Sequence, residues 1–392
     1  MPRAGFEIVV VGAGVLGLSA AHALARRGHQ VVVLEQQTVG HGTAGSKGTA
    51  RIFRLGYDEP GYVRLALLAH SLWRRLEDES GSALLTTTGQ LTFGDDLDVL
   101  VDAMAAAGAP HERLATGEVK ARFPAFSVPG PVLFEPESGV IAADECLAAL
   151  RRTNGVTVRE QTRVAACATH GGRLRLSLET PAGTDEMAAS VVVVCAGPWT
   201  APLVPGRPPG LRPLATLEQA AYLAPAGPVP ARLPVFVERR RPWFYGLPVP
   251  SGGLLKVALH GGGPAVSLGE LDRRGGGGGD ATEDGPDPTL MAQLSASTRR
   301  LLPGLDPHPV ATERCVYDNS ADGNFVIDRV GDVVVGSGTS GHGFKFAPLL
   351  GELLADLATG ADHRPELGSA DDLAPFSLAR LRTTVTARGI HR

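Results

Sequence analysis

The chain lacks the features that mark several large classes of protein. No apolar run in its 392 residues approaches the roughly 20 positions of a membrane-spanning helix, so no membrane partner is expected. Its four cysteines are scattered without CxxC spacing, which argues against a disulfide framework or a zinc site and fits a reducing compartment. The net charge of −4 is too small to suggest nucleic acid as a partner.

What remains is a globular composition. Hydrophobic residues make up 43% of the chain, and its length allows two domains with cores of their own. The N-terminal letters MPRAGFE pass directly into an apolar strand, which leaves no room for a signal peptide and predicts a cytoplasmic location. The 50 glycines and 30 prolines predict many loops.

The first organised stretch is a βαβ unit over residues 7–35. A buried strand at 7–11 is followed by GAGVLG at 12–17, a helix over 19–27 and a second strand at 30–34. In a dinucleotide-binding fold, Gly12 makes the tight turn, Gly14 lets the backbone approach a pyrophosphate, and Gly17 lets helix and strand pack closely. The helix N-terminus supplies free N–H groups to the phosphates.

Glu35 stands at the tip of the second strand, 18 residues after Gly17. That spacing is typical of the acid that binds a ribose. An acid there favours a free 2′-hydroxyl, so the sequence predicts FAD or NAD rather than NADP.

Two further apolar strands of the same kind occur later, at 190–194 before CAGPW and at 333–335 before GSGTSGHGFKF. Alternating strands fill two blocks between them, including an expected strand pair over 84–93. We therefore predict an α/β fold with a Rossmann-like, parallel-sheet domain and an inserted antiparallel-sheet substrate domain. The ranges are 1–84, 141–212 and 318–392 for the first and 85–140 and 213–317 for the second. A Gly-rich segment, 261–288, is expected to be a mobile surface insertion.

Several motifs together resemble one family. They are GAGVLG at 12–17, SKGTARIFR at 46–54, FEPESGVI at 134–141, VVCAGPW at 193–199, FYGLPVPSGGLLKVALH at 244–260, RCVYD at 314–318 and GSGTSGHGFKF at 336–346. Over nearly its whole length the chain resembles the monomeric sarcosine oxidase and N-methyltryptophan oxidase group of FAD-dependent amine oxidases, within the D-amino-acid-oxidase-like fold. The resemblance implies an FAD-binding domain, an antiparallel domain roofing the flavin, and a cysteine bonded covalently to it.

The resemblance also implies a set of cofactor-binding residues. Lys47 is the unusual one, because these oxidases often carry a histidine there. The set is Gly12, Gly14, Val15, Gly17, Glu35, Lys47, Arg51, Ala196, Gly197, Trp199, Cys315, Gly338, Gly341, Gly343, Phe344 and Lys345.

Of the four cysteines, only Cys315 stands in the motif that matches the family's flavin-bonded cysteine, so the resemblance implies that it carries the flavin. The adjacent Arg314 is a positive neighbour that would favour the thiolate, the form that attacks the flavin. The alternative is an ordinary buried cysteine. We interpret the remaining three, Cys146, Cys167 and Cys195, as packing residues.

Arg54 and Lys345 are candidates for a carboxylate clamp. A small amino acid has little apolar area, so its binding energy must come from its carboxylate, which a planar guanidinium and a lysine charge suit. The family places its clamp at the matching positions. The alternatives are that Arg54 pairs with Asp58 or Glu59 and that Lys345 contacts a phosphate.

Lys256 alternates with Leu255 in a predicted strand and so points inward. In the family the matching lysine lies beside flavin N5 and promotes reaction with oxygen; the alternative is a surface lysine. His260 shares its strand face. Together with Tyr245 and Tyr317, it is a weaker candidate for the substrate pocket, and Trp243, Phe244 and Phe236 are expected to add bulk to the pocket roof.

These expectations combine into a function: an FAD-dependent oxidase of a secondary amine, either an N-methyl or a cyclic amino acid. Its products are an imine, or the hydrolysis products of the imine, and hydrogen peroxide. The expected partners are the small substrate and oxygen, and the protein is expected to be a monomer. The alternatives are a dehydrogenase that passes electrons to a carrier protein and a flavin-binding protein without turnover.

Overall fold

The computed structural model describes residues 6–212, 214–225, 233–250, 253–275, 285–362 and 364–382. Its first unit is the predicted one. Strand β1 (Phe6–Val11) leads through a glycine turn into helix α1 (Val15–Arg26) and strand β2 (Val31–Leu34). The helix begins four residues earlier than expected, because Gly14 is already its N-cap residue.

The parallel sheet is built around β1. It pairs in parallel with β2 and with β12 (Gly183–Val194), while β9 (Val156–Arg159) and β20 (Val333–Ser337) extend the sheet on either side. The three apolar strands predicted at 7–11, 190–194 and 333–335 therefore lie side by side, which confirms the Rossmann-like arrangement. Antiparallel strands complete the sheet: β10 (Arg163–His170), β11 (Arg173–Thr180) and β19 (Val326–Val330).

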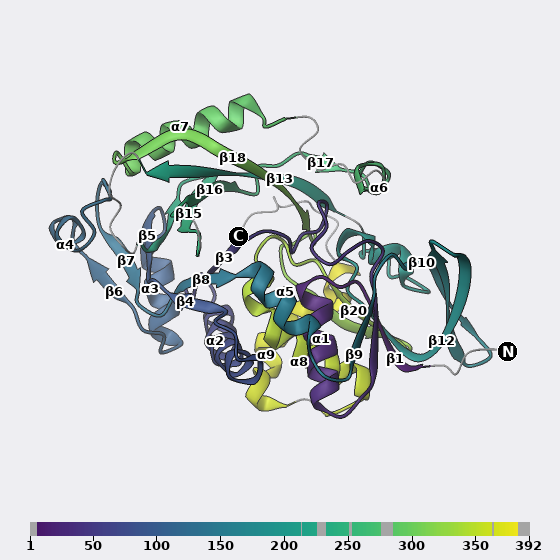
Figure 1. Ribbon diagram of the computed structural model, residues 1–392. Helices are drawn as coiled ribbons and strands as arrows, with labels where there is room; N and C mark the ends of the chain where they lie inside the picture. The colour runs from purple at the N-terminus through teal and green to yellow at the C-terminus, as the bar shows by residue number, and fades with distance from the viewer. Residues whose placement is uncertain are drawn as a thin grey trace.

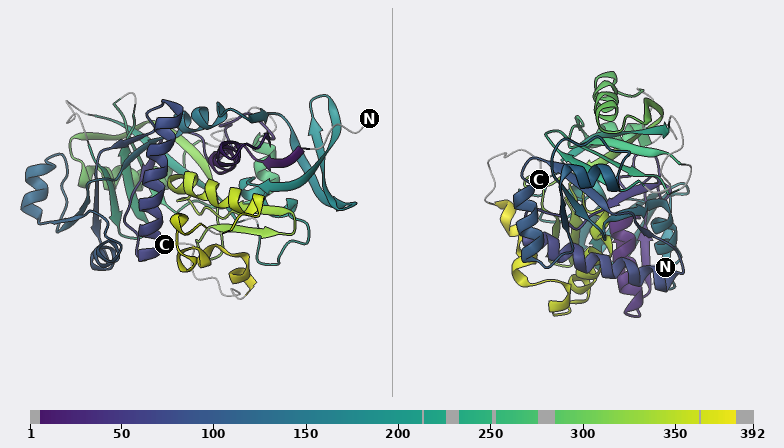
Figure 2. Two further views of the ribbon diagram at one scale, coloured as in Figure 1. Left: turned by 90° about the horizontal axis from the view of Figure 1, so that it is seen from below. Right: turned by 90° about the vertical axis from the view of Figure 1, so that its left-hand side faces the viewer.

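Helices cover one face of this sheet. Helix α1 packs against α8 (Ala347–Thr359) and α5 (Ala143–Arg151), and α2 (Pro60–Ser80) packs on the outer side of α8. Figure 1 shows α1, α2 and α8 in the lower half of the view, and the right-hand view of Figure 2 likewise shows helices below the second layer of strands. Leu, Val and Ala side chains from all four helices form the largest hydrophobic cluster of the protein.

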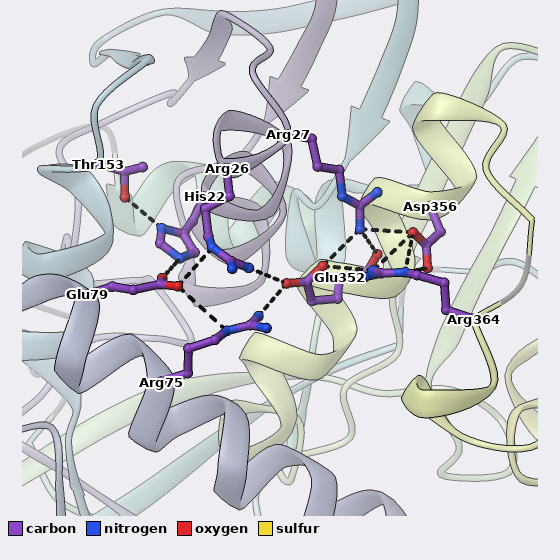
Figure 3. A network of polar contacts seen from close by, with 9 residues as sticks. All are labelled: His22, Arg26, Arg27, Arg75, Glu79, Thr153, Glu352, Asp356 and Arg364. Carbon is purple, nitrogen blue, oxygen red and sulfur yellow. Dashed lines mark hydrogen bonds and ion pairs between the residues drawn. The ribbon is translucent and has the colours of Figure 1, made fainter.

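A polar network ties three of these helices together at their ends (Figure 3). Its centre is the buried carboxylate of Glu352 in α8, which accepts hydrogen bonds from four arginines. These are Arg26 (3.0 Å), Arg27 (2.9 Å), Arg75 (2.5 Å) and Arg364 (2.8 Å). The helices are thus held together by this network of ion pairs as well as by an apolar core.

The second large sheet is mainly antiparallel and lies above the first in Figure 1. Helix α7 (Pro288–Leu301) packs along β18 on its outer face. Its strands come from residues 90–135 and 215–318, the two blocks in which alternation was predicted. They are β5 (Gln90–Gly94), β6 (Glu112–Leu114), β7 (Val132–Glu135), β13 (Ala215–Pro225), β14 (Val235–Arg239), β15 (Trp243–Pro248), β16 (Leu255–His260), β17 (Ala265–Val266) and β18 (Leu305–Asp318).

A small third sheet corrects one prediction. The expected strand pair over 84–93 forms two strands, but β4 (Leu85–Thr87) and β5 do not pair with each other. Strand β4 joins β3 (Ala50–Phe53) and β8 (Gly139–Ala142), whereas β5 pairs with β7 and β14. Alternation predicted the strands, but their partners lie far away in the sequence, so local pattern could not assign the pairing.

The Gly-rich segment 261–288 is only partly the expected irregular insertion. It contains β17 and helix α6 (Leu268–Gly275), and α7 begins at its end; residues 276–284 lie outside the described residues. None of the helices within the described ranges has both the length and the apolar character of a membrane span. The remaining elements are α3 (Leu97–Ala106), α4 (Thr116–Arg122), α9 (Ala370–Leu373) and short 3₁₀ helices at Gly197–Trp199, Ala201–Leu203, Phe344–Phe346, Pro365–Leu367, Ala374–Phe376 and Leu378–Arg382.

Candidate active site

A cavity of about 350 Å³ lies between the two large sheets. One wall is formed by the segments that follow β1, β2 and β12, and the other by side chains of β13, β15, β16 and β18. The carboxyl ends of parallel strands are where open α/β sheets bind their ligands. All six residues predicted for catalysis line this cavity: Arg54, Tyr245, Lys256, His260, Tyr317 and Lys345.

Most of the predicted cofactor residues border the same cavity. The exceptions are Gly17, Lys47 and Gly338, which support its walls. The lining residues among them are Gly12, Gly14, Val15, Glu35, Arg51, Ala196, Gly197, Trp199, Cys315, Gly341, Gly343, Phe344 and Lys345.

The glycine turn after β1 is tightly packed. Gly12 has φ of +98°, and a Cβ there would lie 2.4 Å from the carbonyl oxygen of Cys195 in the neighbouring segment. A Cβ on Gly17 would lie 2.0 Å from the carbonyl oxygen of Gly12, so this glycine allows the helix to sit against the turn, as predicted. Gly14 borders the open cavity. The turn therefore provides the close backbone approach that a dinucleotide phosphate requires.

Glu35 occupies the tip of β2, as the motif predicted. Its buried carboxylate accepts hydrogen bonds from the backbone N–H groups of Ala13 (2.8 Å) and Gln37 (3.0 Å). Burial raises its pKa, and these amides partly offset that effect. His41, which the sequence did not single out, lies 3.6 Å from the same carboxylate, and burial lowers its pKa to about 4. The fit to a ribose hydroxyl is good, because the carboxylate is fixed and borders the cavity.

Arg51 connects the loop at 45–49 to the site. Its guanidinium donates to the carbonyl oxygens of Ala50 (2.9 Å), Gly45 (3.1 Å) and Lys47 (2.5 Å) and lies 5.6 Å from the ring centroid of Phe344. Lys47 thus contributes a backbone carbonyl to the position of Arg51. The result is a fixed cation in the cavity wall.

Cys315 faces the cavity from β18. The prediction that Arg314 favours the thiolate of Cys315 is wrong, because successive side chains of a strand point to opposite faces. Arg314 instead donates to the carbonyl oxygen of Gly285. Burial raises the pKa of the Cys315 thiol, and the nearby charges of Arg51 and Lys256 offset this effect only in part. The positive neighbours are therefore provided by other strands.

Arg54 and Lys345 meet around Tyr57. The Arg54 guanidinium lies 4.2 Å and the Lys345 ammonium 5.9 Å from the centroid of the Tyr57 ring. Arg54 donates to the carbonyl oxygen of Gly56 (2.6 Å) and Lys345 to that of His342 (3.1 Å). Both carboxylate oxygens of Asp58 accept from Arg239, at 2.8 and 3.0 Å, so that acid is engaged elsewhere. Burial and the nearby Arg54 lower the pKa of Lys345 well below its usual value.

Lys256 is buried and lines the cavity, which excludes the surface alternative. His260 lies on the same face of β16, where its ring contacts Trp243 (centroids 6.1 Å apart) and Tyr317 (5.9 Å). Trp243 also lines the cavity, as expected for a bulky roof residue, whereas Phe236 and Phe244 are buried in the core of the antiparallel sheet.

Sequence reasoning missed several polar residues of this site. His342 lies within the recognised motif GSGTSGHGFKF and lines the cavity; burial lowers its pKa well below its usual value. Glu218 stands directly opposite Cys315 across the β13–β18 pair and also lines the cavity. Glu313 forms an ion pair with Lys256 at 2.7 Å. The sequence held one signal for Glu313: it precedes Cys315 by two residues in one strand, which places both side chains on the same face.

Comparisons with known proteins agree with this geometry. A family model described as FAD dependent oxidoreductase matches residues 7–357. The chain is 32% identical to peroxisomal sarcosine oxidase of Homo sapiens, with 96% of each chain covered, and 29% identical to monomeric sarcosine oxidase of Bacillus sp. (strain NS-129), covering 96% of this chain and 97% of that protein. The solved open form of NikD, an unusual amino acid oxidase essential for nikkomycin biosynthesis, is 28% identical with a TM-score of 0.77, over 95% of this chain and 97% of that one. The chain therefore belongs to the family of FAD-dependent oxidoreductases, and it is related to the sarcosine oxidases within it.

Proposed function

We propose that the protein is an oxidase of a secondary amine, an N-methyl or cyclic amino acid, that releases an imine and hydrogen peroxide. The observation that carries this proposal is the convergence of three cationic side chains, Arg54, Lys345 and Lys256, on one cavity of an FAD-dependent oxidoreductase. When bound, FAD supplies the two-electron acceptor for the C–N bond, so the residues need only bind, orient and shelter the substrate.

Arg54 and Lys345 are proposed to hold the substrate carboxylate. They approach one aromatic ring, and the low pKa of Lys345 reflects burial beside a second cation. A bound carboxylate supplies the missing counter-charge and therefore favours the protonated lysine. Charge-assisted hydrogen bonds to two donors would fix the orientation of a ligand with little apolar area.

Lys256 is proposed to serve the oxygen step. Transfer of an electron to dioxygen creates a negative charge, which a fixed cation in a sheltered site stabilises. The aromatic wall formed by His260, Trp243 and Tyr317 would confine the substrate beside it. Cys315, with Arg51 and Lys256 as nearby cations, is proposed to carry the flavin covalently.

One observation favours a second candidate, a dehydrogenase that passes electrons to a carrier protein. Glu313 pairs with Lys256 and offsets part of the charge that an oxygen step would use. Peroxide measurement separates the two candidates: an oxidase forms about one hydrogen peroxide for each amine oxidised in air, and a dehydrogenase forms none. A panel of N-methyl and cyclic amino acids, assayed for peroxide, would identify the substrate class.

The clamp is tested by Arg54→Met and Lys345→Met. Removal of one member of a buried charged pair costs on the order of 2–5 kcal/mol, so each variant should weaken the binding of carboxylate substrates by about thirtyfold or more. The measurement is flavin reduction without oxygen, as a function of substrate concentration.

The matched substrate is the same amine without its carboxylate, which should be affected far less. The matched variant is Arg113→Met, because Arg113 forms an exposed pair with Asp98 far from the cavity lining and should leave the reaction unchanged. Equal losses for both substrates would remove the clamp from the proposal.

The oxygen step is tested by Lys256→Met. Reduction of the flavin by substrate requires no cation at this position and should change little. Reoxidation should slow by about a hundredfold to a thousandfold, the usual effect of losing one preorganised electrostatic partner. Stopped-flow mixing of the reduced protein with aerated buffer measures this rate directly, and an unchanged rate would contradict the assignment.

A further inference from the structure

The side chains of Lys256 and Tyr222 both contact the carboxylate of Glu313. The Lys256 ammonium lies 2.7 Å from Oε2 of Glu313, and both side chains are buried, with 6% and 13% of their surface exposed. The hydroxyl of Tyr222 donates to the same oxygen at 2.5 Å, and the ammonium lies 5.5 Å from the Tyr222 ring centroid. Lys256 and Glu313 therefore form an ion pair in the protein interior and not a mobile ion pair at the surface.

Strand register holds these three side chains together. Strand β13 lies between β16 and β18, with Tyr222 opposite Lys256 and Ala220 opposite Glu313. Residues that pair directly across antiparallel strands point to the same face. Glu313 is also two residues from Cys315, so the carboxylate shares the face of β18 that borders the cavity.

The loop just before β3 confines the carboxylate of Glu313 from the other side. A Cβ on Gly48, whose φ is +96°, would lie 2.3 Å from Oε1 of Glu313. Glycine therefore leaves the space that the carboxylate occupies, and any larger residue would displace it. The position of Glu313 is fixed both by its own sheet and by the cofactor side of the cavity.

Charged and titratable groups reach Lys256 from several elements. Arg51 comes from β3, Asp144 from α5, Tyr222 from β13, and Glu313 and Cys315 from β18. Burial and Arg51 lower the pKa of Lys256, and Glu313 offsets this effect only in part. Burial raises the pKa of Glu313, but Lys256, Tyr222 and Arg51 together outweigh that effect, so the pKa is lowered. The carboxylate and the ammonium thus each favour the charged form of the other.

We propose that Glu313 is a positioning residue that keeps Lys256 a cation beside its neighbour Arg51 during the oxygen step. The inference rests on the proposed function of Lys256. In that step dioxygen would take up two electrons and two protons, supplied by reduced FAD when it is bound, and become hydrogen peroxide. The first electron forms the superoxide anion, which only a protonated Lys256 stabilises as a cation. Without Glu313 two cations face each other in a buried site, and Lys256 gives up its proton.

The test compares the FAD-bound wild type with Glu313→Gln, Glu313→Asp and Lys256→Met. Reoxidation of the reduced proteins is followed by stopped flow between pH 6 and pH 10. For the wild type and for Glu313→Asp, which keeps the charge, we expect the rate to fall only toward the basic end of this range, because the pKa of Lys256 is lowered but Glu313 partly offsets that effect. For Glu313→Gln the rate should approach the wild-type value in acid and fall by about a hundredfold in base. A packing role alone would harm the shorter aspartate at least as much as glutamine, without a pH profile.

A second measurement needs no oxygen. The absorption spectrum of the oxidised, FAD-bound Glu313→Gln protein should shift with pH as Lys256 titrates, and the shift should vanish in the double variant Glu313→Gln/Lys256→Met. If Glu313→Gln fails to retain FAD, the double variant should regain it, because removal of both charges leaves neither buried and unpaired. No spectral titration, or no recovery, would overturn the inference.

The outcomes separate the inference from the function on which it rests. Slow reoxidation of Lys256→Met beside a wild-type profile for Glu313→Gln overturns the role of Glu313 alone. Faster reoxidation of Glu313→Gln at every pH also overturns it, since the carboxylate would then damp the charge. An unchanged rate in Lys256→Met overturns the proposed oxygen step itself.

Discussion

Replacement of Glu352 by glutamine should destabilise the protein by an amount that the structure allows us to estimate. The carboxylate is 5% exposed and accepts from four arginines that belong to α1, α2 and the segment after α8. Burial opposes its charge, but the hydrogen bonds from Arg364 and Arg27 and the charge of Arg75 lower its pKa from 4.5 to about 2. The network of Figure 3 therefore favours the ionised form strongly.

The shift converts into stability by linkage. A pKa that is lower in the folded protein by about 2.5 units corresponds to about 3 kcal/mol, present above the unfolded pKa and lost as the pH falls through the folded pKa. The contribution should be complete at pH 7 and about 1.5 kcal/mol at pH 3. Glutamine keeps the shape and loses the charge, so Glu352→Gln should be less stable by about 2–3 kcal/mol at neutral pH.

The assay is urea denaturation of the FAD-bound wild type and variant at pH 7 and at lower pH. Glu112→Gln is the matched control. Its carboxylate forms an exposed pair with Arg122, in which both side chains are more than 40% exposed, and such pairs contribute about 0–1 kcal/mol. A deficit of Glu352→Gln no larger than that of the control, or one that does not narrow in acid, would refute the reasoning.

Two further predictions concern the cofactor. Cys315→Ala should release the flavin into the supernatant on acid precipitation, whereas wild-type flavin should stay with the chain, because the thiol is the proposed point of attachment; flavin lost equally from both would contradict covalent attachment. Gly17→Ala should weaken FAD binding and lower the melting temperature, because its Cβ would lie 2.0 Å from the carbonyl oxygen of Gly12. Gly117→Ala in α4, where a Cβ would contact nothing within 4 Å, should do neither, and equal effects would contradict the packing argument.

Local pattern predicted the parts of the fold that are encoded locally. Most side chains of the apolar runs at 7–11, 190–194 and 333–335 are buried whichever face they point to, so no alternation was needed to find these strands. The strand partners of β4 and β5 could not be predicted in the same way. Both strands alternate correctly, but their pairing depends on residues about 40 or more positions away.

The candidate site shows the same division. Lys256 and Cys315 could be placed by motif and by strand alternation. Glu313 could not be matched to Lys256, because 57 residues separate them and only the intervening β13 brings their strands together. The sequence predicts Arg314 as the neighbour of the thiol because the two residues are adjacent, whereas side chains adjacent along a strand point to opposite faces.

The alternation of β18 has a consequence for how this chain can vary. Side chains two residues apart in this strand point to the same side, and these are Glu313, Cys315 and Tyr317. Insertion or deletion of one residue just before Glu313 would turn Arg314 toward the side that these three residues now face and turn all three away from it at once. Length changes in this segment should therefore be tolerated only in pairs or beyond its ends, and a sequence aligned with this one through a single-residue gap at 306–313 should not be expected to share its chemistry.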